Sequence, residues 1–187
     1  MKKSILFLLL LISSCLFAQT EEIKCGSDRW SVKTLTDSNA SQVDFKHVVK
    51  SSVYKQTLLE GHDIKANTPR LEDETTVYRI TGWLIEYRTE ADNDLHLVIK
   101  DDKSDSTMVA EICDPSCPGL KKSPAYKKFV TVRKKFKKFY PKKSMKNISN
   151  HIQIEGVGFF DKKHSISPKG NAWNNREIHP VTKLKFL

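Results

Sequence analysis

Five segments with the residue pattern of β-strands surround one amphipathic helix in the second half of the chain. The first segment is rich in β-branched and aromatic residues, and turn residues follow the first three segments, at Asp92 and Asn93, at Asp101 and at Asp114 and Pro115. Between the third and fourth segments, apolar residues recur at helical spacing from about Ser123 to about Tyr140, where Pro141 follows. The element order β-β-β-α-β-β leaves few possible folds. The strand segments cover residues 77–88, 94–100, 107–112, 151–160 and 176–186.

This order is typical of an OB-fold, a five-stranded Greek-key barrel whose helix joins strands three and four. We therefore expect a mainly β (β-rich α+β) domain over residues 75–187, an OB-fold-like five-stranded barrel with one amphipathic basic helix closing its open end. Gly82 predicts a bulge or bend in the first strand, and Pro180 predicts an edge position or a bulge in the last. Residues 19–74 show no clean period and predict an extended N-terminal arm, with one or two short strands, that packs on the barrel.

The first eighteen residues predict an export signal. Two lysines precede an apolar run over residues 5–12, which is too short to span a bilayer. Cleavage after Ala18 would release a periplasmic or secreted protein. Residues 12–15 also resemble a lipobox, so a lipoprotein anchored at Cys15 is the alternative. Because no later apolar run reaches about 18 residues, we expect no transmembrane segment in the mature chain.

Three cysteines remain in the mature chain, namely Cys25, Cys113 and Cys117. Export favours a disulfide, and three cysteines allow three single pairings that each leave one thiol over. A bridge between Cys25 and Cys117 would tie the N-terminal segment to the barrel, and this is the pairing that we expect. Cys113 and Cys117 could instead close a small ring. Since no Cys-x-x-Cys spacing occurs, we interpret the bridge as structural.

The end of the chain resembles a family of uncharacterised exported bacterial domains whose ends read roughly GVGFFD…H…G…NGIELHPV. The resemblance covers most of the mature chain and implies an OB-fold-like barrel without a settled activity. This sequence departs from the pattern in its long Lys-rich helix, in Cys113 and in residues 171–175. The matching residues are Arg29, Trp30, Val32–Thr34, Asp94–Val98, Glu111, Asp114, Pro115, Cys117, Gly156–Asp161, His164, Gly170 and Glu177–Val181, the last of which read EIHPV.

Two acid–histidine pairs indicate a metal or catalytic site. Asp94 and His96 lie on one strand and Glu177 and His179 on another, and the strand period of two places each pair on one face. Carboxylates and imidazoles bind Zn²⁺ or another divalent ion and act as general acids and bases. These four residues are therefore the candidate catalytic residues, and a hydrogen-bonded structural network is the alternative interpretation. The candidate metal ligands are His96, Asp161, His164 and His179.

Positive charge is concentrated in the predicted helix and its flanks. Residues 121–146 hold twelve Lys and Arg and no acid, whereas the rest of the mature chain has 18 basic and 22 acidic residues. Such a segment indicates binding to an anionic polymer or an anionic membrane surface. OB barrels also bind ligands across strands two and three, a surface that Arg79, Tyr87, Arg88, Lys100 and Lys103 could line. The candidate polyanion-binding residues are Lys127, Lys128, Arg133, Lys134, Lys135, Lys137 and Lys138.

Three functions agree with these features. The first is an exported, non-enzymatic binding module for nucleic acid or another polyanion, which needs no cofactor. The second is a metal-assisted hydrolase of phosphodiesterase type that uses the Asp/His/Glu cluster and a divalent metal. The third is a structural interaction domain of the bacterial envelope whose basic helix contacts anionic lipid. The sequence contains no phosphate-binding loop, nucleophile elbow or dinucleotide fingerprint, which disfavours the enzyme classes that use them.

Overall fold

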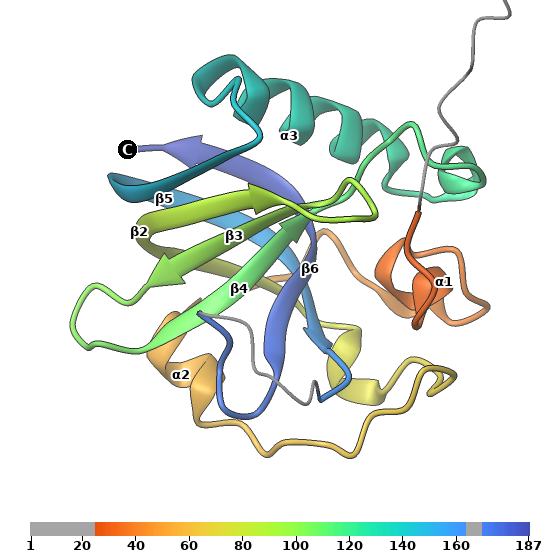
Figure 1. The fold of residues 1–187 in the computed structure, drawn as a ribbon. Helices are drawn as coiled ribbons and strands as arrows, with labels where there is room; N and C mark the ends of the chain where they lie inside the picture. Colours follow the sequence, from red (N-terminus) through yellow and green to blue (C-terminus); the bar gives the residue numbers. More distant parts are fainter. Residues whose placement is uncertain (1–24, 164–169) are drawn as a thin grey trace, which may run out of the picture.

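The computed structural model describes residues 25–163 and 170–187, so the predicted export signal, Cys15 and His164 lie outside the described residues. Five strands form a closed ring, and a sixth strand lies beside it (Figure 1). The order around the ring is β2-β3-β4-β6-β5, and β5 pairs again with β2. The OB-fold-like barrel is therefore confirmed. Its strands are β2 (Val77–Thr89), β3 (Leu95–Lys100), β4 (Thr107–Ile112), β5 (Ser144–Phe160) and β6 (Arg176–Phe186).

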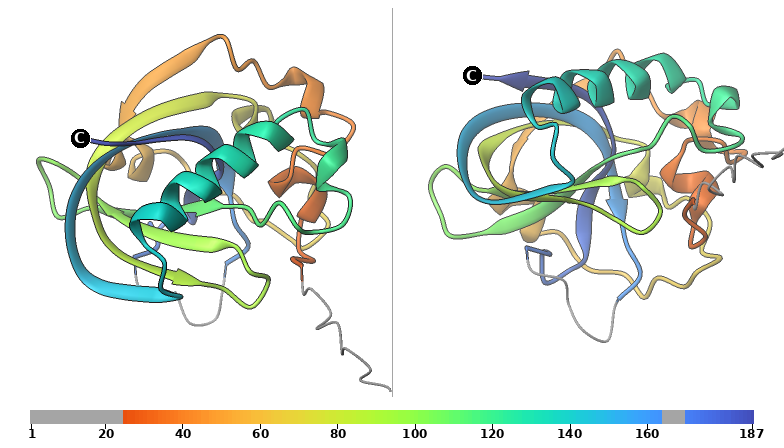
Figure 2. Two further views of the ribbon diagram at one scale, coloured as in Figure 1. Left: turned by 90° about the horizontal axis from the view of Figure 1, so that it is seen from above. Right: turned by 45° about the horizontal axis from the view of Figure 1, so that its top comes forward.

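The helix α3 (Tyr126–Phe139) lies across one end of the barrel, as Figure 2 shows from above. Phe136 enters the barrel core, where its ring meets Tyr87 of β2 edge to face with centroids 5.0 Å apart. The predicted start at Ser123 is three residues too early. The amide of Ala125 donates to the Ser123 hydroxyl, so this serine shapes the turn after the short 3-10 helix η3 (Leu120–Lys122) instead of capping α3.

Two strands differ from their predicted form. The strand β5 begins seven residues before the predicted His151, because its polar first part pairs with the end of β2, where Lys146 is opposite Glu86. The bulge in β2 lies between Leu84 and Glu86 and not at Gly82. A Cβ atom on Gly82 would lie 2.5 Å from the carbonyl oxygen of Lys100, so the glycine is required by close backbone approach.

The last strand, β6, lies between β4 and β5 and is therefore not an edge strand. Its register against β5 shifts on both sides of Gly156, which faces Val181, and Pro180 lies within this irregular stretch. Pro180 predicted either an edge position or a bulge, and the bulge is the alternative that the structure confirms. Val109 and Ala110 of β4 pair in parallel with Glu177 and Ile178 of β6, and this short contact closes the ring.

Residues 25–74, which we call the arm, pack along one side of the barrel (Figure 1), where Leu35, Ala40 and Val43 share an apolar cluster with Val77 of β2, Val157 of β5 and Phe129 of α3. The arm contains one strand, which pairs in parallel with the first half of β2. It contains more helix than predicted; in α2, for example, the Ser52 hydroxyl accepts from the amide of Lys55 at the N-terminus. Its elements are α1 (Trp30–Lys33), η1 (Ala40–Gln42), β1 (Val48–Ser52), α2 (Val53–Thr57) and η2 (Glu72–Glu74).

A disulfide, and hydrogen bonds between a buried ion pair of the arm and the backbone of Phe160, hold the arm on the barrel. Arg29 pairs with Glu74, with 2.8 Å between Nη1 and Oε1, and also donates to the carbonyl of Phe160 at the end of β5. The predicted disulfide joins Cys25 to Cys117. Within the described residues, no helix is both long enough and apolar enough to cross a membrane.

Candidate functional site

The register of three strands brings acids and imidazoles together on the outer face of the barrel. His96 of β3 is directly opposite Glu111 of β4, and the parallel pairing of β4 with β6 places His179 on the other side of Glu111. The neighbouring residues Leu95, Leu97 and Ile178 point into the barrel core, so the polar side chains point outward. All three polar residues are nevertheless buried, because the arm covers this face.

Glu111 is the centre of this cluster. Its Oε1 lies 3.1 Å from Nδ1 of His96, with which it forms a hydrogen bond. Its Oε2 lies 3.0 Å from Nδ1 of His179, an ion-pair contact whose angle does not fit a hydrogen bond. Burial alone would raise the pKa of Glu111, but His179, His96 and the ammonium group of Lys33 hold it well below its usual value. Glu111 is therefore ionised. Because Nδ1 of each imidazole faces Glu111, Nε2 of each ring points away from it.

A cavity of about 460 Å³ opens between the arm and the barrel beside this cluster. Nε2 of His96 and Oε2 of Glu177 are buried in its wall and have no hydrogen-bond partner among the described residues. Burial, with the charges of Glu111 and Asp161, raises the pKa of Glu177 well above its usual value and favours its neutral form. The polar residues that line the cavity are Ser27, Asp28, Lys33, Arg88, Glu90, Asp92, His96, Glu111, Asp161, Asn171 and Glu177.

Lys33, from the end of α1, reaches the cavity from the arm. Its Nζ lies 3.4 Å from Oδ1 of Asp161. Burial would lower the pKa of Lys33, but Glu111, Asp161 and Glu177 together raise it above its usual value. The ammonium group therefore stays charged and offsets part of the negative charge. Even so, the lining residues include six carboxyl groups and only two permanent cations, Lys33 and Arg88.

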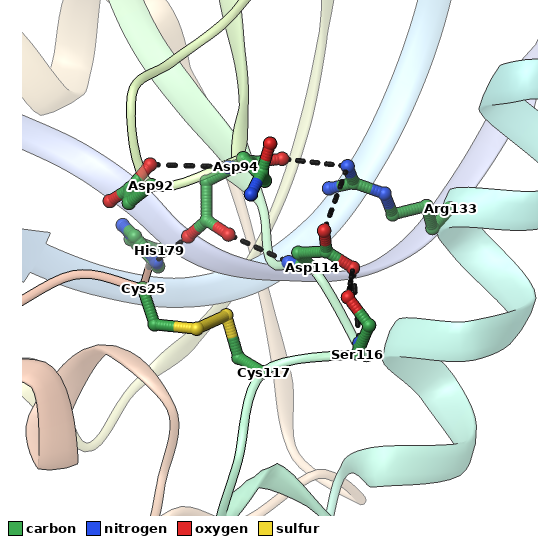
Figure 3. Close-up of a disulfide and its surroundings, with 9 residues drawn as sticks. Cys25, Asp92, Asp94, Asp114, Ser116, Cys117, Arg133 and His179 are labelled. Atoms are coloured by element: carbon green, nitrogen blue, oxygen red, sulfur yellow. Dashed lines mark hydrogen bonds and ion pairs between the residues drawn. A yellow bond between two sulfur atoms is a disulfide. The ribbon is translucent and has the colours of Figure 1, made fainter. Parts of the chain in front are cut away.

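A second group of possible metal ligands, Asp94, Cys113 and His179, includes two residues that Figure 3 shows near the disulfide, Asp94 and His179. Nε2 of His179 is 3.6 Å from Oδ2 of Asp94 and 3.6 Å from Sγ of Cys113. The amide of Asp114 donates to Oδ1 of Asp94 at 2.6 Å, whereas Oδ2 has no hydrogen-bond partner among the described residues. Burial and the charge of Glu111 raise the pKa of Asp94, and burial and the charge of Asp94 raise that of Cys113.

The structure gathers most of the predicted metal and catalytic residues. Asp94, His96, Glu177 and His179 lie in one connected cluster, and Asp161 lines the cavity beside it. Sequence reasoning did not propose Lys33, Glu111 or Cys113 as site residues. The signal for Glu111 was the short turn between β3 and β4, because an antiparallel hairpin about that turn places it opposite His96.

Some side chains of the predicted basic surface contact other parts of the protein, and the others are exposed. Arg133 donates to the carbonyls of Asn93 and Ile112, at 2.6 and 3.2 Å, and Nζ of Lys128 lies 5.3 Å from the centre of the Phe45 ring. Lys137 is half-buried. The exposed candidates on α3 are Lys127, Lys128, Lys134, Lys135 and Lys138.

The surface proposed across strands two and three is less basic than its residues suggested. Tyr87 is in the barrel core and cannot line it. Arg79 pairs with Glu155, Arg88 with Glu90, and Lys100 with Asp105, each at about 2.7–2.8 Å. The remaining candidate, Lys103, is exposed.

Comparison with known proteins gives no family. No protein-family model and no curated protein matches this chain. Among solved structures, the chain is similar to "OBody AM3L09 bound to hen egg-white lysozyme", with a TM-score of 0.35 and 11% identity over 60% of this chain and 81% of that one. It is also similar to the Entamoeba histolytica asparaginyl-tRNA synthetase, with a TM-score of 0.35 and 14% identity over 75% of this chain and 24% of that one. Likenesses of this size carry no argument about function.

Proposed function

We propose that this chain is an exported, barrel-based binding module whose ligand is a divalent cation held in the cavity under the arm. The observation that carries this proposal is a pair of buried atoms in the cavity wall, Nε2 of His96 and Oε2 of Glu177, that have no hydrogen-bond partner in the described part of the chain. Buried polar atoms almost always have a partner, and an exception calls for an ion or a water molecule. The disulfide supports the export part, because such bonds persist in oxidising compartments.

The charges around the cavity favour a cation over an anion. Six carboxyl groups and one imidazole face two permanent cations. Carboxylate oxygens and imidazole nitrogen suit Mn²⁺ and Zn²⁺, whereas an anionic ligand would have to approach several acids at once. A bound divalent cation would also favour the ionised form of Glu177, whose burial otherwise keeps it neutral.

Calorimetric titration of the mature chain, residues 19–187, with Mn²⁺ tests this proposal. The informative variant is Glu177→Gln, because glutamine mimics the neutral acid and keeps the fold while removing the anionic ligand. We expect at least tenfold weaker binding. The matched control is Glu155→Gln, an acid paired with Arg79 and Lys183 far from the cavity, which should bind as the parent does. Absence of Mn²⁺ binding, or equal binding by the two variants, would contradict the proposal.

A second candidate function is the binding of nucleic acid or another polyanion by α3. The supporting observation is that four exposed lysines on α3 form no ion pair with any acid in the part of the chain that the structure describes. Their charges therefore remain available to phosphates. These lysines are Lys127, Lys134, Lys135 and Lys138.

Fluorescence anisotropy with a labelled single-stranded oligonucleotide at about 0.15 M salt tests this second candidate. Changing the four lysines to glutamine should abolish binding and flatten its salt dependence. The matched control changes four exposed lysines of the arm by the same charge. Equal loss in both variants would indicate an effect of net charge alone. The control lysines are Lys46, Lys50, Lys55 and Lys65.

A further inference from the structure

We propose a second metal site, separate from the cavity, in which Cys113, His179 and Asp94 bind Zn²⁺ or a similar ion that accepts sulfur and nitrogen. The three donor atoms lie within 4.8 Å of one another, and all three residues are buried. Neither the sequence nor the proposed function assigns this thiol a role. The site does not depend on the cavity, because its donors come from the other side of His179.

The distance between His179 and Asp94 fits metal coordination better than hydrogen bonding. Nε2 of His179 lies 3.6 Å from Oδ2 of Asp94, which is too long for a hydrogen bond. In a tetrahedral zinc site, the usual bond lengths place sulfur and nitrogen donors about 3.6 Å apart and nitrogen and oxygen donors about 3.4 Å apart. The observed distance from Sγ of Cys113 to Nε2 is 3.6 Å. Two of the three distances among the donor atoms therefore match those of a zinc tetrahedron, and the third, from Sγ of Cys113 to Oδ2 of Asp94, is within 4.8 Å.

The free oxygen of Asp94 is the second, independent observation. Asp94 is fully buried, and its Oδ2 points toward His179 without a hydrogen-bond partner among the described residues. Its other oxygen is fixed by the amide of Asp114. A ligand carboxylate in metal sites is commonly held in this way through its second oxygen.

Neighbouring groups orient the other two donors. Glu111 lies 3.0 Å from Nδ1 of His179, so Nε2 of that ring is the nitrogen that faces Cys113. A carboxylate on the far nitrogen is the usual partner of a metal-binding histidine. Sγ of Cys113 also lies 4.0 Å from the carbonyl oxygen of Lys33. Zn²⁺ with one thiolate and one carboxylate is neutral overall, which makes its burial tolerable.

Co²⁺ is the probe that distinguishes this site from the cavity. In residues 19–187, Cys113 is the one thiol outside the disulfide, so a thiolate-to-Co²⁺ charge-transfer band reports Cys113 alone. We expect the parent and Glu177→Gln to show this band at one equivalent of Co²⁺, and Zn²⁺ to abolish it by displacement. Cys113→Ser should lack the band. Asp94→Asn, which keeps the thiol, should show it with at least tenfold weaker Co²⁺ binding.

Two results would overturn the inference. The first is Co²⁺ binding by the parent without a charge-transfer band, which would place the ion in the acidic cavity or on the surface. The second is a band of equal affinity in Asp94→Asn, which would remove the carboxylate from the ligand set. Both results are measured on proteins that keep Cys113, namely the parent and Asp94→Asn. A folding defect of Cys113→Ser therefore does not affect them. Failure of the Mn²⁺ titration alone would leave this inference intact.

Discussion

The disulfide between Cys25 and Cys117 joins residues separated by 92 positions, and we expect it to provide much of the stability of the folded chain. Closing a loop of that length in the unfolded chain costs an entropy equivalent to about 4.6 kcal/mol at 25 °C. The double variant Cys25→Ser with Cys117→Ser should therefore unfold with a free energy lower by about 2–5 kcal/mol. For a fold of this size, the corresponding decrease in Tm is roughly 5–20 °C.

Urea denaturation followed by tryptophan fluorescence measures this difference. The oxidised parent, the parent in reductant and the double variant are compared, and the latter two should agree. Reductant should not change the double variant, which is the control for effects of the reagent. The urea dependence should steepen on reduction, because an unfolded chain without the cross-link exposes more surface. A change below about 1 kcal/mol would refute the loop-entropy argument and indicate that the buried contacts of the arm persist in the unfolded ensemble.

Two further predictions concern groups away from the cavity. Glu74→Gln leaves the buried Arg29 without its charge partner and should lower the free energy of unfolding by about 3–5 kcal/mol in the same urea assay. Asp101→Asn should be destabilising at neutral pH but not in acid. Burial would raise the pKa of Asp101, but the amides of Tyr54 and Lys103 lower it overall. Because the pKa of Asp101 is lower in the folded protein than its value near 3.8 in the unfolded chain, the ionised side chain stabilises the fold at any pH above 3.8. This stabilisation is lost as the pH falls through the pKa of the folded protein. The difference in free energy of unfolding between variant and parent should therefore disappear below the folded-state pKa of Asp101. A difference that is independent of pH would contradict the argument.

The barrel could be predicted because its strands carry their own pattern. Leu95, Leu97 and Ile99 alternate with outward-facing residues, and the change to helical spacing at Tyr126 marks α3. The first part of β5 could not be predicted, since five of the seven residues 144–150 are polar and the segment becomes a strand only through pairing with β2. The helices of the arm were missed for a related reason.

The arm forms its core with residues distant in the sequence. Leu35 and Val43 pack with Phe129 of α3 and with Cys117, which lie far along the chain. No local period in residues 25–74 records those contacts. The same reason applies to the site: the spacing of two in each strand predicted which side chains share a face, but not that Lys33 of the arm would lie among them. Long-range packing had to be known first.

The side chains on the outer face of β3, β4 and β6 are not those that would make the fold most stable. Once the arm covers this face, apolar side chains could fill it. Replacing buried ionic groups by well-packed apolar residues is often neutral or stabilising. The face holds Asp94, His96, Glu111, Glu177 and His179 instead, and several of their polar atoms have no hydrogen-bond partner in residues 25–163 and 170–187. Desolvation of these groups lowers the stability of the fold, and the disulfide offsets part of that cost by constraining the unfolded chain. A cover held this firmly over destabilising groups supports a binding site rather than a structural network, because a network would have its hydrogen bonds completed within the protein.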